Sequence, residues 1–105
     1  MNKPLETSRA PNESELLSLV VPVFNERSML PLFFEHVLPI LASLDIRSEI
    51  VVVDDGSEDG SAEFVRTFIK RKSSIRLVKL SRNFGKEAAV TAGLEHAKGD
   101  VVIVL

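Results

Sequence analysis

Two adjacent carboxylates are the residues of this chain best suited to chemistry. Asp54 and Asp55 directly follow the apolar run 50–53. Like charges this close raise each other's cost of ionisation, so such a pair usually needs a ligand, a metal or backbone donors nearby. An acid at the end of a buried strand is suited to hydrogen bonds with a ribose hydroxyl or a base N–H group. We therefore interpret the pair as part of a ligand site, whereas turn and helix-cap roles suit Ser57 and Asp59.

Two cations and a glycine follow a later apolar run. Arg82 and Lys86 bracket Gly85 at the point where a helical pattern begins. Free N–H groups and positive potential at a helix start favour an anion such as a phosphate. The segment is not a P-loop, because Glu87 follows Lys86 and no glycine precedes it at the required spacing.

A third candidate segment places an aromatic ring, an amide and a carboxylate after the first apolar run, at Phe24, Asn25 and Glu26. Pro22 precedes them and removes one backbone donor from the strand. Helix capping is an alternative role for Asn25 and Glu26. The sequence lacks the Gly-x-Gly-x-x-Gly turn of nicotinamide and flavin domains, which is evidence against those classes.

These three segments share one arrangement, because each follows a strand-like run and precedes a helical pattern. The runs 17–21 and 50–53 are too continuously apolar for a sheet with one wet face. Alternating strands and helices predict an α/β fold, with a mostly parallel sheet of about four strands and helices on both faces. Ligands bind outside the carboxyl ends of the strands in such sheets, so the three segments should share one crevice.

The first two helical patterns have clear apolar stripes. Between residues 30 and 44 the apolar residues fall at spacings of three and four. Ser28 is the expected N-cap of this helix, and Pro39 is expected to kink it or end it early. A second helix is expected over residues 61–72.

The last helix and strand carry a different pattern. A helix is expected over residues 86–97, where small residues such as Ala89 and Gly93 would let it approach the sheet closely. Gly99 suits the left-handed position that follows a helix end. The run 101–105 is then expected to be a buried strand.

Composition limits the functional classes. The chain has 105 residues, of which 45% are hydrophobic and 27% charged, as in ordinary folded domains. Thirteen Lys+Arg against 15 Asp+Glu give a net charge of −2, which offers no basis for a nucleic-acid partner. Without cysteine there is no disulfide framework or thiolate metal site. Residues 1–15 are expected to be a disordered polar leader, and no window reaches the roughly 18 apolar residues of a membrane span.

Several motifs succeed one another in a fixed order: VVPVFNE at 20–26, VVDDGSEDGS at 52–61, LSRNFGKE at 80–87, TAGL at 91–94 and GD at 99–100. This ordered set resembles the start of the inverting family 2 glycosyltransferases, which have the GT-A fold. The resemblance is closest to the polyprenyl-phosphate sugar transferases, such as bactoprenol glucosyltransferases and dolichol-phosphate mannose synthases. It implies that residues 16–105 are the N-terminal, Rossmann-like nucleotide-sugar-binding part of a GT-A domain, truncated at its fourth strand.

The resemblance also implies a set of nucleotide-sugar-binding residues. They are Pro22, Phe24, Glu26, Asp54, Asp55, Arg82 and Lys86. The first loop would flank the base and the ribose, and the acidic pair, chiefly its second member, would read uracil or guanine. The basic segment would border the diphosphate and the entrance for the sugar or acceptor.

The family's Asp-x-Asp element, which holds Mg²⁺ or Mn²⁺ on the diphosphate, comes after the strand that ends at Leu105. The resemblance therefore implies no metal ligand and no catalytic residue within this chain, and we do not expect catalysis by residues 1–105 alone. It implies an enzyme that transfers a hexose, with UDP-glucose as the favoured donor, to a polyprenyl phosphate. The full-length protein is expected at the cytoplasmic face of the membrane, held by segments outside this chain, and an oligomer is left open.

Two alternatives belong to other classes. One is a phosphoacceptor receiver domain, because residues 50–55 and 99–105 resemble the strands that carry its acidic pair and its phosphorylated aspartate. Against it, a receiver begins with the acidic-pair strand, whereas here a full strand and helix precede that strand. The other alternative is a non-catalytic nucleotide-binding fragment, which would differ from the enzyme only in the sequence after Leu105.

Overall fold

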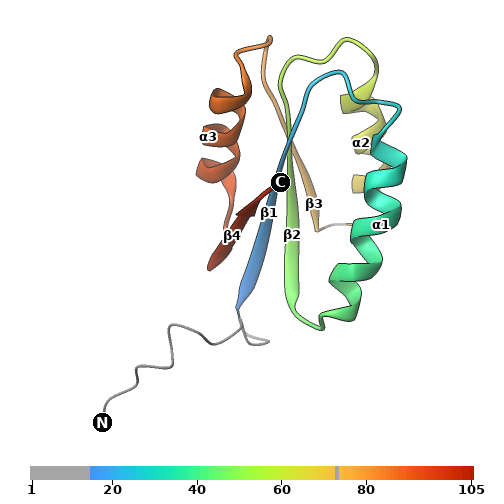
Figure 1. Cartoon of the computed structure of the whole chain (residues 1–105), viewed down its shortest axis with the longest axis vertical. Helices are drawn as coiled ribbons and strands as arrows, with labels where there is room; N and C mark the ends of the chain where they lie inside the picture. Colours follow the sequence, from blue (N-terminus) through green and yellow to red (C-terminus); the bar gives the residue numbers. More distant parts are fainter. Residues whose placement is uncertain (1–14, 73) are drawn as a thin grey trace.

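The computed structural model describes residues 15–72 and 74–105 (Figure 1). Nearly all of the expected leader at residues 1–15 lies outside the described residues. Strands and helices alternate along the described chain. They are β1 (Leu16–Val23), α1 (Leu30–Ser43), β2 (Arg47–Asp54), α2 (Ser61–Ile69), β3 (Ile75–Lys79), α3 (Lys86–His96) and β4 (Val101–Val104).

The four strands form one parallel sheet in the order β3-β2-β1-β4. Helices α1 and α2 cover one face and α3 covers the other (Figure 1). This arrangement confirms the predicted α/β fold. The chain steps from β1 to β2 to β3 in one direction and then returns to the far side of β1, so the topological switch point lies between β1 and β4. A ligand site is expected there, at the carboxyl ends of the strands.

The two central strands are buried on both faces, which explains their continuous apolar runs. Val20, Val51 and Val53 are fully buried against Ala89 of α3. The alternate residues of the same strands face α1 and α2 and pack around Phe34, which is 1% exposed. The predicted close approach of α3 is confirmed, because a Cβ atom at Gly93 would lie only 2.3 Å from Cγ1 of Val20.

The helix boundaries differ from the predictions in several places. Ser28 is not the N-cap of α1: Met29 holds that position without a side-chain cap, and its N–H donates to the carbonyl oxygen of Glu26 at 3.0 Å. The helix also continues past Pro39 to Ser43, so the early end is wrong. Helix α2 ends at Ile69 and α3 at His96, earlier than residues 72 and 97.

Gly99 is not in the left-handed region, contrary to the prediction. It is instead a site of close packing, because an added Cβ would lie 2.4 Å from Oγ of Ser18 and 2.8 Å from the carbonyl oxygen of Leu16. Glycine is needed here because the backbone after α3 runs directly against β1.

Strand β4 lies at the outer edge of the sheet beside β1. The expected strand is confirmed over Val101–Val104, but residues 101–105 are 37% to 52% exposed, so its expected burial is wrong for this structure. Within residues 15–72 and 74–105, no strand pairs with the outer edge of β4. In the same ranges, no helix is both long and apolar enough to cross a membrane.

Candidate functional site

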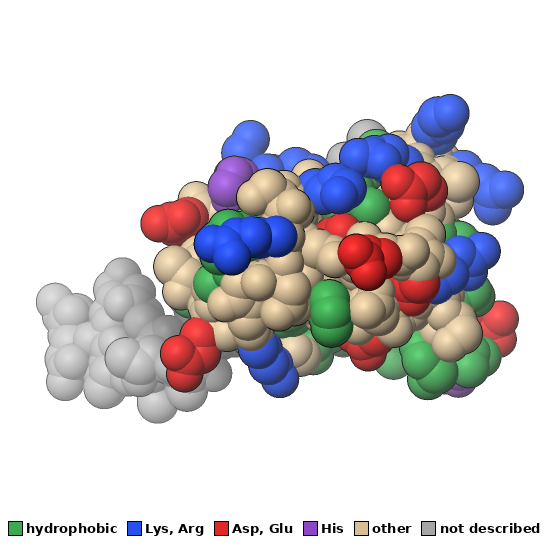
Figure 2. Space-filling model, turned by 90° about the horizontal axis from the view of Figure 1, so that it is seen from above, with side chains coloured by type: hydrophobic (Ala, Val, Ile, Leu, Met, Phe, Trp, Pro, Cys, Tyr) green, Lys and Arg blue, Asp and Glu red, His purple; other side chains and the backbone are tan. Residues whose placement is uncertain are grey.

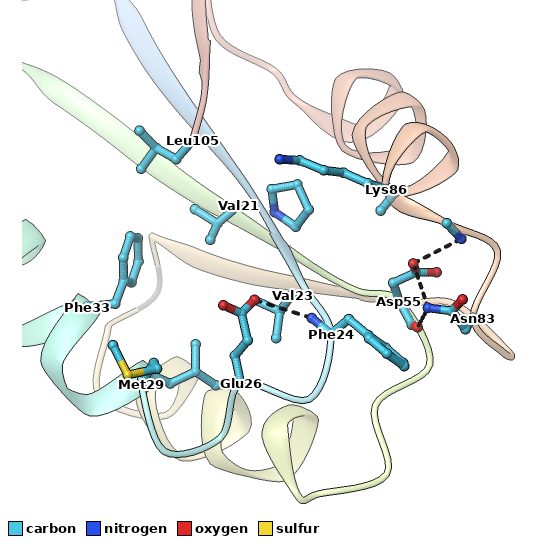
Figure 3. A pocket seen from close by; sticks show the side chains of 14 residues that line it. Val21, Val23, Phe24, Glu26, Met29, Phe33, Asp55, Asn83, Lys86 and Leu105 are labelled. Carbon is cyan, nitrogen blue, oxygen red and sulfur yellow. Dashed lines mark hydrogen bonds between the residues drawn. The ribbon is translucent and has the colours of Figure 1, made fainter.

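A cavity of about 600 Å³ lies at the carboxyl end of β1, next to the switch point (Figure 3). This volume is within the usual range for small-molecule sites. Of the seven predicted binding residues, five line the cavity: Pro22, Phe24, Glu26, Asp55 and Lys86. Asn83 and Gly85 line it beside Asp55, and the other lining residues form an apolar floor: Val21, Val23, Met29, Leu30, Phe33, Ala89 and Leu105.

Asp55 is 3% exposed and bonded to the loop that leads into α3. The N–H of Phe84 donates to Oδ1 at 2.8 Å, and the N–H of Gly85 donates to Oδ2 at 3.0 Å. The amide nitrogen of the Asn83 side chain also donates to Oδ2, at 3.1 Å. A carboxylate can accept about four hydrogen bonds, so one acceptor position remains for a base N–H. Base reading by Asp55 stays a prediction.

Asp54 has a different environment, although it is the adjacent residue. It is 1% exposed and does not line the cavity. The N–H of Ser57 donates to its Oδ1 at 3.2 Å, whereas Oδ2 has no hydrogen-bond partner among the described residues. The two carboxylates therefore do not face the same site in this structure. Base reading by Asp54 stays a prediction.

The structure also separates the two predicted cations. Lys86 lines the main cavity, whereas Arg82 lines a smaller hollow of about 330 Å³. The guanidinium carbon of Arg82 lies 4.4 Å from the centroid of the Phe84 ring, in cation–π contact. The N–H groups of Phe84 and Gly85 already donate to Asp55. An anion at this helix start would therefore bind the N–H groups of the first turn of α3, which begins at Lys86.

The loop after β1 and the loop after β2 are joined by side-chain hydrogen bonds. The N–H of Asn25 donates to Oγ of Ser57 at 2.8 Å, and the N–H of Glu58 donates to Oδ1 of Asn25 at 2.9 Å. Asp59 accepts the N–H of Arg27 at 2.9 Å. Sequence reasoning assigns capping or turn roles to Asn25, Ser57 and Asp59 and does not foresee that they connect two loops.

Gly60 holds the N-cap position of α2 without a side-chain cap. Of the turn and cap roles predicted for Asp59, the structure therefore shows the turn role, just before the helix. The Oδ1 atom of Asp59 accepts the N–H of Ser61 at 3.0 Å and the hydroxyl of Ser61 at 2.6 Å. The Ser61 hydroxyl and then the Arg27 N–H lower the pKa of Asp59 below its ordinary value, because they stabilise the carboxylate form. The Asp59 carboxylate therefore forms hydrogen bonds both with the loop after β1 and with the start of α2.

The polar groups of the cavity are arranged around its apolar floor. Glu26 points into the cavity in Figure 3, with Oε1 at 3.5 Å from the N–H of Phe24, and the Phe24 ring is 45% exposed. Figure 2 looks onto this end of the sheet and shows acidic side chains near the middle, with both basic and acidic ones around the rim. The site can therefore hold a ligand that has an apolar or aromatic part, donor groups and an anionic group.

The described residues do not fit the expected Mg²⁺ or Mn²⁺. No group of three His, Cys, Asp or Glu side chains in residues 15–72 and 74–105 is placed to bind a metal. The Asp55 carboxylate already accepts three hydrogen bonds from the α3 loop.

Residues 18–105 match the family model described as Glycosyl transferase family 2. The chain belongs to glycosyl transferase family 2. This membership, together with the strand and helix that precede the acidic-pair strand, rules out the receiver alternative.

Named proteins that are similar in sequence to this chain are sugar transferases, which agrees with the family match. The chain is 45% identical over 96 residues to an undecaprenyl-phosphate 4-deoxy-4-formamido-L-arabinose transferase of Pseudomonas savastanoi pv. phaseolicola. A protein of the same name from Aeromonas hydrophila is 42% identical over 92 residues. These alignments cover 90% and 87% of the chain but only 28% of each relative, so the chain spans little more than a quarter of their length.

Solved structures show the same fold. A mannosyltransferase from Pyrobaculum calidifontis, in complex with GDP-Man and Mn²⁺, superposes with a TM-score of 0.67 at 29% identity. It is matched over 89% of this chain and 28% of its own. The S. aureus protein TarS (residues 1–349) gives a TM-score of 0.65 at 27% identity, over 85% of this chain and 26% of its own.

Proposed function

We propose that the protein containing this chain transfers a sugar from a nucleotide diphosphate donor to a polyprenyl phosphate. The described residues would form the part that binds the donor nucleotide. The observation that carries the proposal is the cavity at the switch point, which has Phe24, Glu26 and Asp55 on its wall and Lys86 at the start of α3. The names of the relatives, which are undecaprenyl-phosphate sugar transferases, support the acceptor class.

In this proposal the base and ribose lie against Pro22, Phe24 and Glu26, and the remaining acceptor position of Asp55 receives a base N–H. Lys86 and the first N–H groups of α3 face the diphosphate. An acceptor phosphate oxygen attacks the anomeric carbon and forms the new bond. The bond from that carbon to the diphosphate breaks, and its electron pair leaves with the nucleoside diphosphate. Attack opposite the leaving group inverts the carbon, and the positive charge of Lys86 stabilises the developing anion.

UDP-glucose is our preferred donor, because residues 82–87 resemble the bactoprenol glucosyl branch. The names of the relatives favour a second candidate, a nucleotide-linked 4-deoxy-4-formamido-L-arabinose. We place the whole protein at the cytoplasmic face of the membrane, held there by segments outside residues 1–105. A non-catalytic protein that only binds the nucleotide remains the alternative to the enzyme.

Transfer to lipid tests the proposal. Membranes containing the full-length protein are incubated with undecaprenyl phosphate, Mg²⁺ and one labelled donor: UDP-glucose, GDP-mannose or nucleotide-linked 4-deoxy-4-formamido-L-arabinose. We expect label in the lipid extract with one donor, and a loss of about tenfold or more in Lys86→Ala and Asp55→Ala, since each removes a charge-assisted contact.

Lys70→Ala is the matched control, because Lys70 is an exposed lysine at the end of α2. Label that stays out of the lipid with every donor, while nucleotide still binds, would support the non-catalytic alternative. Equal transfer by Lys86→Ala and the unchanged protein would contradict the site.

A further inference from the structure

We propose that Asn25 is a positioning residue of the nucleotide site. Its hydrogen bonds join the loop after β1 to the loop after β2, and so hold Phe24 and Glu26 in position on the cavity wall. The inference rests on the proposed function, because it assigns a role toward the same nucleotide. We call the hydrogen-bonded group of Asn25, Ser57, Glu58 and Asp59, with the N–H of Arg27, the loop clasp.

The first observation is the direction of the side chains. Phe24 and Glu26 line the cavity, whereas Asn25 between them does not. Asn25 has a φ of 51°, in the left-handed region, which asparagine tolerates better than most residues. The amide side chain contacts the neighbouring loop, where its Oδ1 accepts the N–H of Glu58.

The second observation is that the contact is reciprocal. Asn25 donates its N–H to Oγ of Ser57 and accepts the N–H of Glu58, at 2.8 and 2.9 Å. Two residues further on, Arg27 donates its N–H to Asp59 at 2.9 Å, and its guanidinium carbon lies 4.0 Å from the Phe64 ring centroid on α2. The backbone on both sides of Glu26 is therefore tied to the β2–α2 region.

The third observation is that the side chains of Phe24 and Glu26 have little other support, although the carbonyl oxygen of Glu26 also accepts the N–H groups of Met29 and Leu30 at the start of α1. Phe24 is 45% exposed, and the bond between its N–H and Oε1 of Glu26 is long, at 3.5 Å. Side chains with few packing contacts are held mainly through their backbone. Because the loop clasp orders that backbone before a ligand arrives, it lowers the entropic cost of binding. A turn that served stability alone would not affect nucleotide affinity in this way.

Three variants separate positioning from simple turn formation. Asn25→Gly keeps the left-handed φ but removes the side-chain acceptor, and Asn25→Asp keeps that acceptor. Ser57→Ala removes the acceptor of the Asn25 N–H without changing the backbone preference. Asp45→Gly is the matched control, because Asp45 has a φ of 54° in the turn between α1 and β2, at the other end of the sheet.

The full-length protein is labelled with ¹⁵N and measured by NMR, first for amide hydrogen exchange and then in titrations with UDP and GDP. In the unchanged chain the amides of Asn25, Arg27 and Glu58 should be protected. Asn25→Gly should lose protection at Glu58 and bind nucleotide about five- to tenfold more weakly, the scale of one lost hydrogen bond. Asn25→Asp should restore the affinity to within about twofold, and Asp45→Gly should change neither quantity.

The outcomes distinguish the two proposals. If the full-length, unchanged chain binds neither nucleotide, the proposed nucleotide site is overturned, and the positioning role falls with it. If that chain binds, but Asn25→Gly binds equally well after losing protection at Glu58, only the positioning role is wrong. Should Asn25→Gly fail to fold, Ser57→Ala decides: unchanged affinity with an unprotected Asn25 amide overturns the role, and weaker binding supports it.

Discussion

Asp54 and Asp55 show how much one step along the chain changes a side chain. Successive residues of a strand face opposite sides, so two adjacent acids at a strand end do not share an environment. Asp55 lines the cavity and collects three donors from the α3 loop, whereas Asp54 faces Ser57. The sequence predicted that the pair needs a ligand, a metal or backbone donors. At Asp55, two backbone amides and one side-chain amide supply these donors.

Gly56 is a second residue on which the site depends. Its φ is +78°, and an added Cβ would lie 2.4 Å from the carbonyl carbon of Arg82 and the nitrogen of Asn83. Gly60 has a similar φ of +89° but nothing within 4 Å, so it is the matched control. We expect Gly56→Ala to lower the free energy of unfolding by about 2–5 kcal/mol, from backbone strain and overpacking together, and Gly60→Ala by about 1–2 kcal/mol from strain alone.

Urea unfolding of the two variants checks this expectation. Equal losses of unfolding free energy in the two variants would contradict it. They would mean that the loop before α3 moves away freely from Gly56, so that its contact with the loop after β2 is not a fixed part of the site.

At the scale of elements, the end of the sheet opposite the cavity is held by a buried polar cluster. Glu49 of β2 accepts the hydroxyl of Ser18 at 2.5 Å, the N–H of Lys98 at 2.7 Å and the guanidinium of Arg76 at 2.8 Å. The hydroxyl of Ser18 accepts the N–H of Gly99. This cluster connects β1, β2 and β3 to the segment between α3 and β4, and so sets where β4 begins.

Glu49 makes this connection pH-dependent. Burial by itself would raise its pKa, but the hydrogen bonds from Ser18, Lys98 and Arg76 outweigh burial, and the pKa lies below its ordinary value of 4.5. A carboxyl group whose pKa is lowered on folding contributes stability above its unfolded pKa and loses that contribution as the pH falls through its folded pKa. The contribution of Glu49 should therefore be complete near neutrality and decline below pH 4.5.

Glu49→Gln tests this dependence. It should lower the free energy of unfolding by about 1.5–3 kcal/mol near neutral pH, because it removes charge-assisted hydrogen bonds, and by less near pH 3. Glu63→Gln is the control, since Glu63 forms an exposed pair with Arg66 and should change stability by less than about 1 kcal/mol. Urea unfolding at both pH values gives the comparison, and a Glu49→Gln loss that is independent of pH would contradict it.

At the scale of the whole molecule, the free edge of β4 is the most exposed apolar surface of the sheet. Residues 101–105 carry no charge, and all are at least 37% exposed. Unpaired backbone groups beside apolar side chains form a template for another strand. We therefore expect the 105-residue chain to self-associate through this edge.

Sedimentation velocity over a range of concentrations checks self-association. Val102→Lys together with Val104→Lys should return the chain to a monomer, because charges on an edge oppose strand pairing. Ile40→Lys is the control, since Ile40 is an exposed apolar residue on α1, at 58% exposure. An unchanged chain that sediments as a monomer, or equal effects of the β4 and α1 changes, would contradict pairing at β4.

Patterns in the amino-acid sequence are enough to predict the order of strands and helices, the parallel sheet and the three polar segments at its carboxyl end. All three features depend on local patterns: apolar runs, helical spacing and the positions at which both stop. The predicted starts of α2 at Ser61 and α3 at Lys86 are confirmed for this reason. The family resemblance added the residues expected to face a nucleotide.

Which of those side chains share a cavity, and which bind another loop, depends on the tertiary structure. The donors to Asp55 come from 28 to 30 residues further along the chain, and the partners of Asn25 lie 32 and 33 residues away. Gly99 likewise is small because β1 lies against it, not because of a helix end. Such pairings depend on strand register and helix position, which no local pattern encodes, because they are fixed only when the sheet and helices pack together.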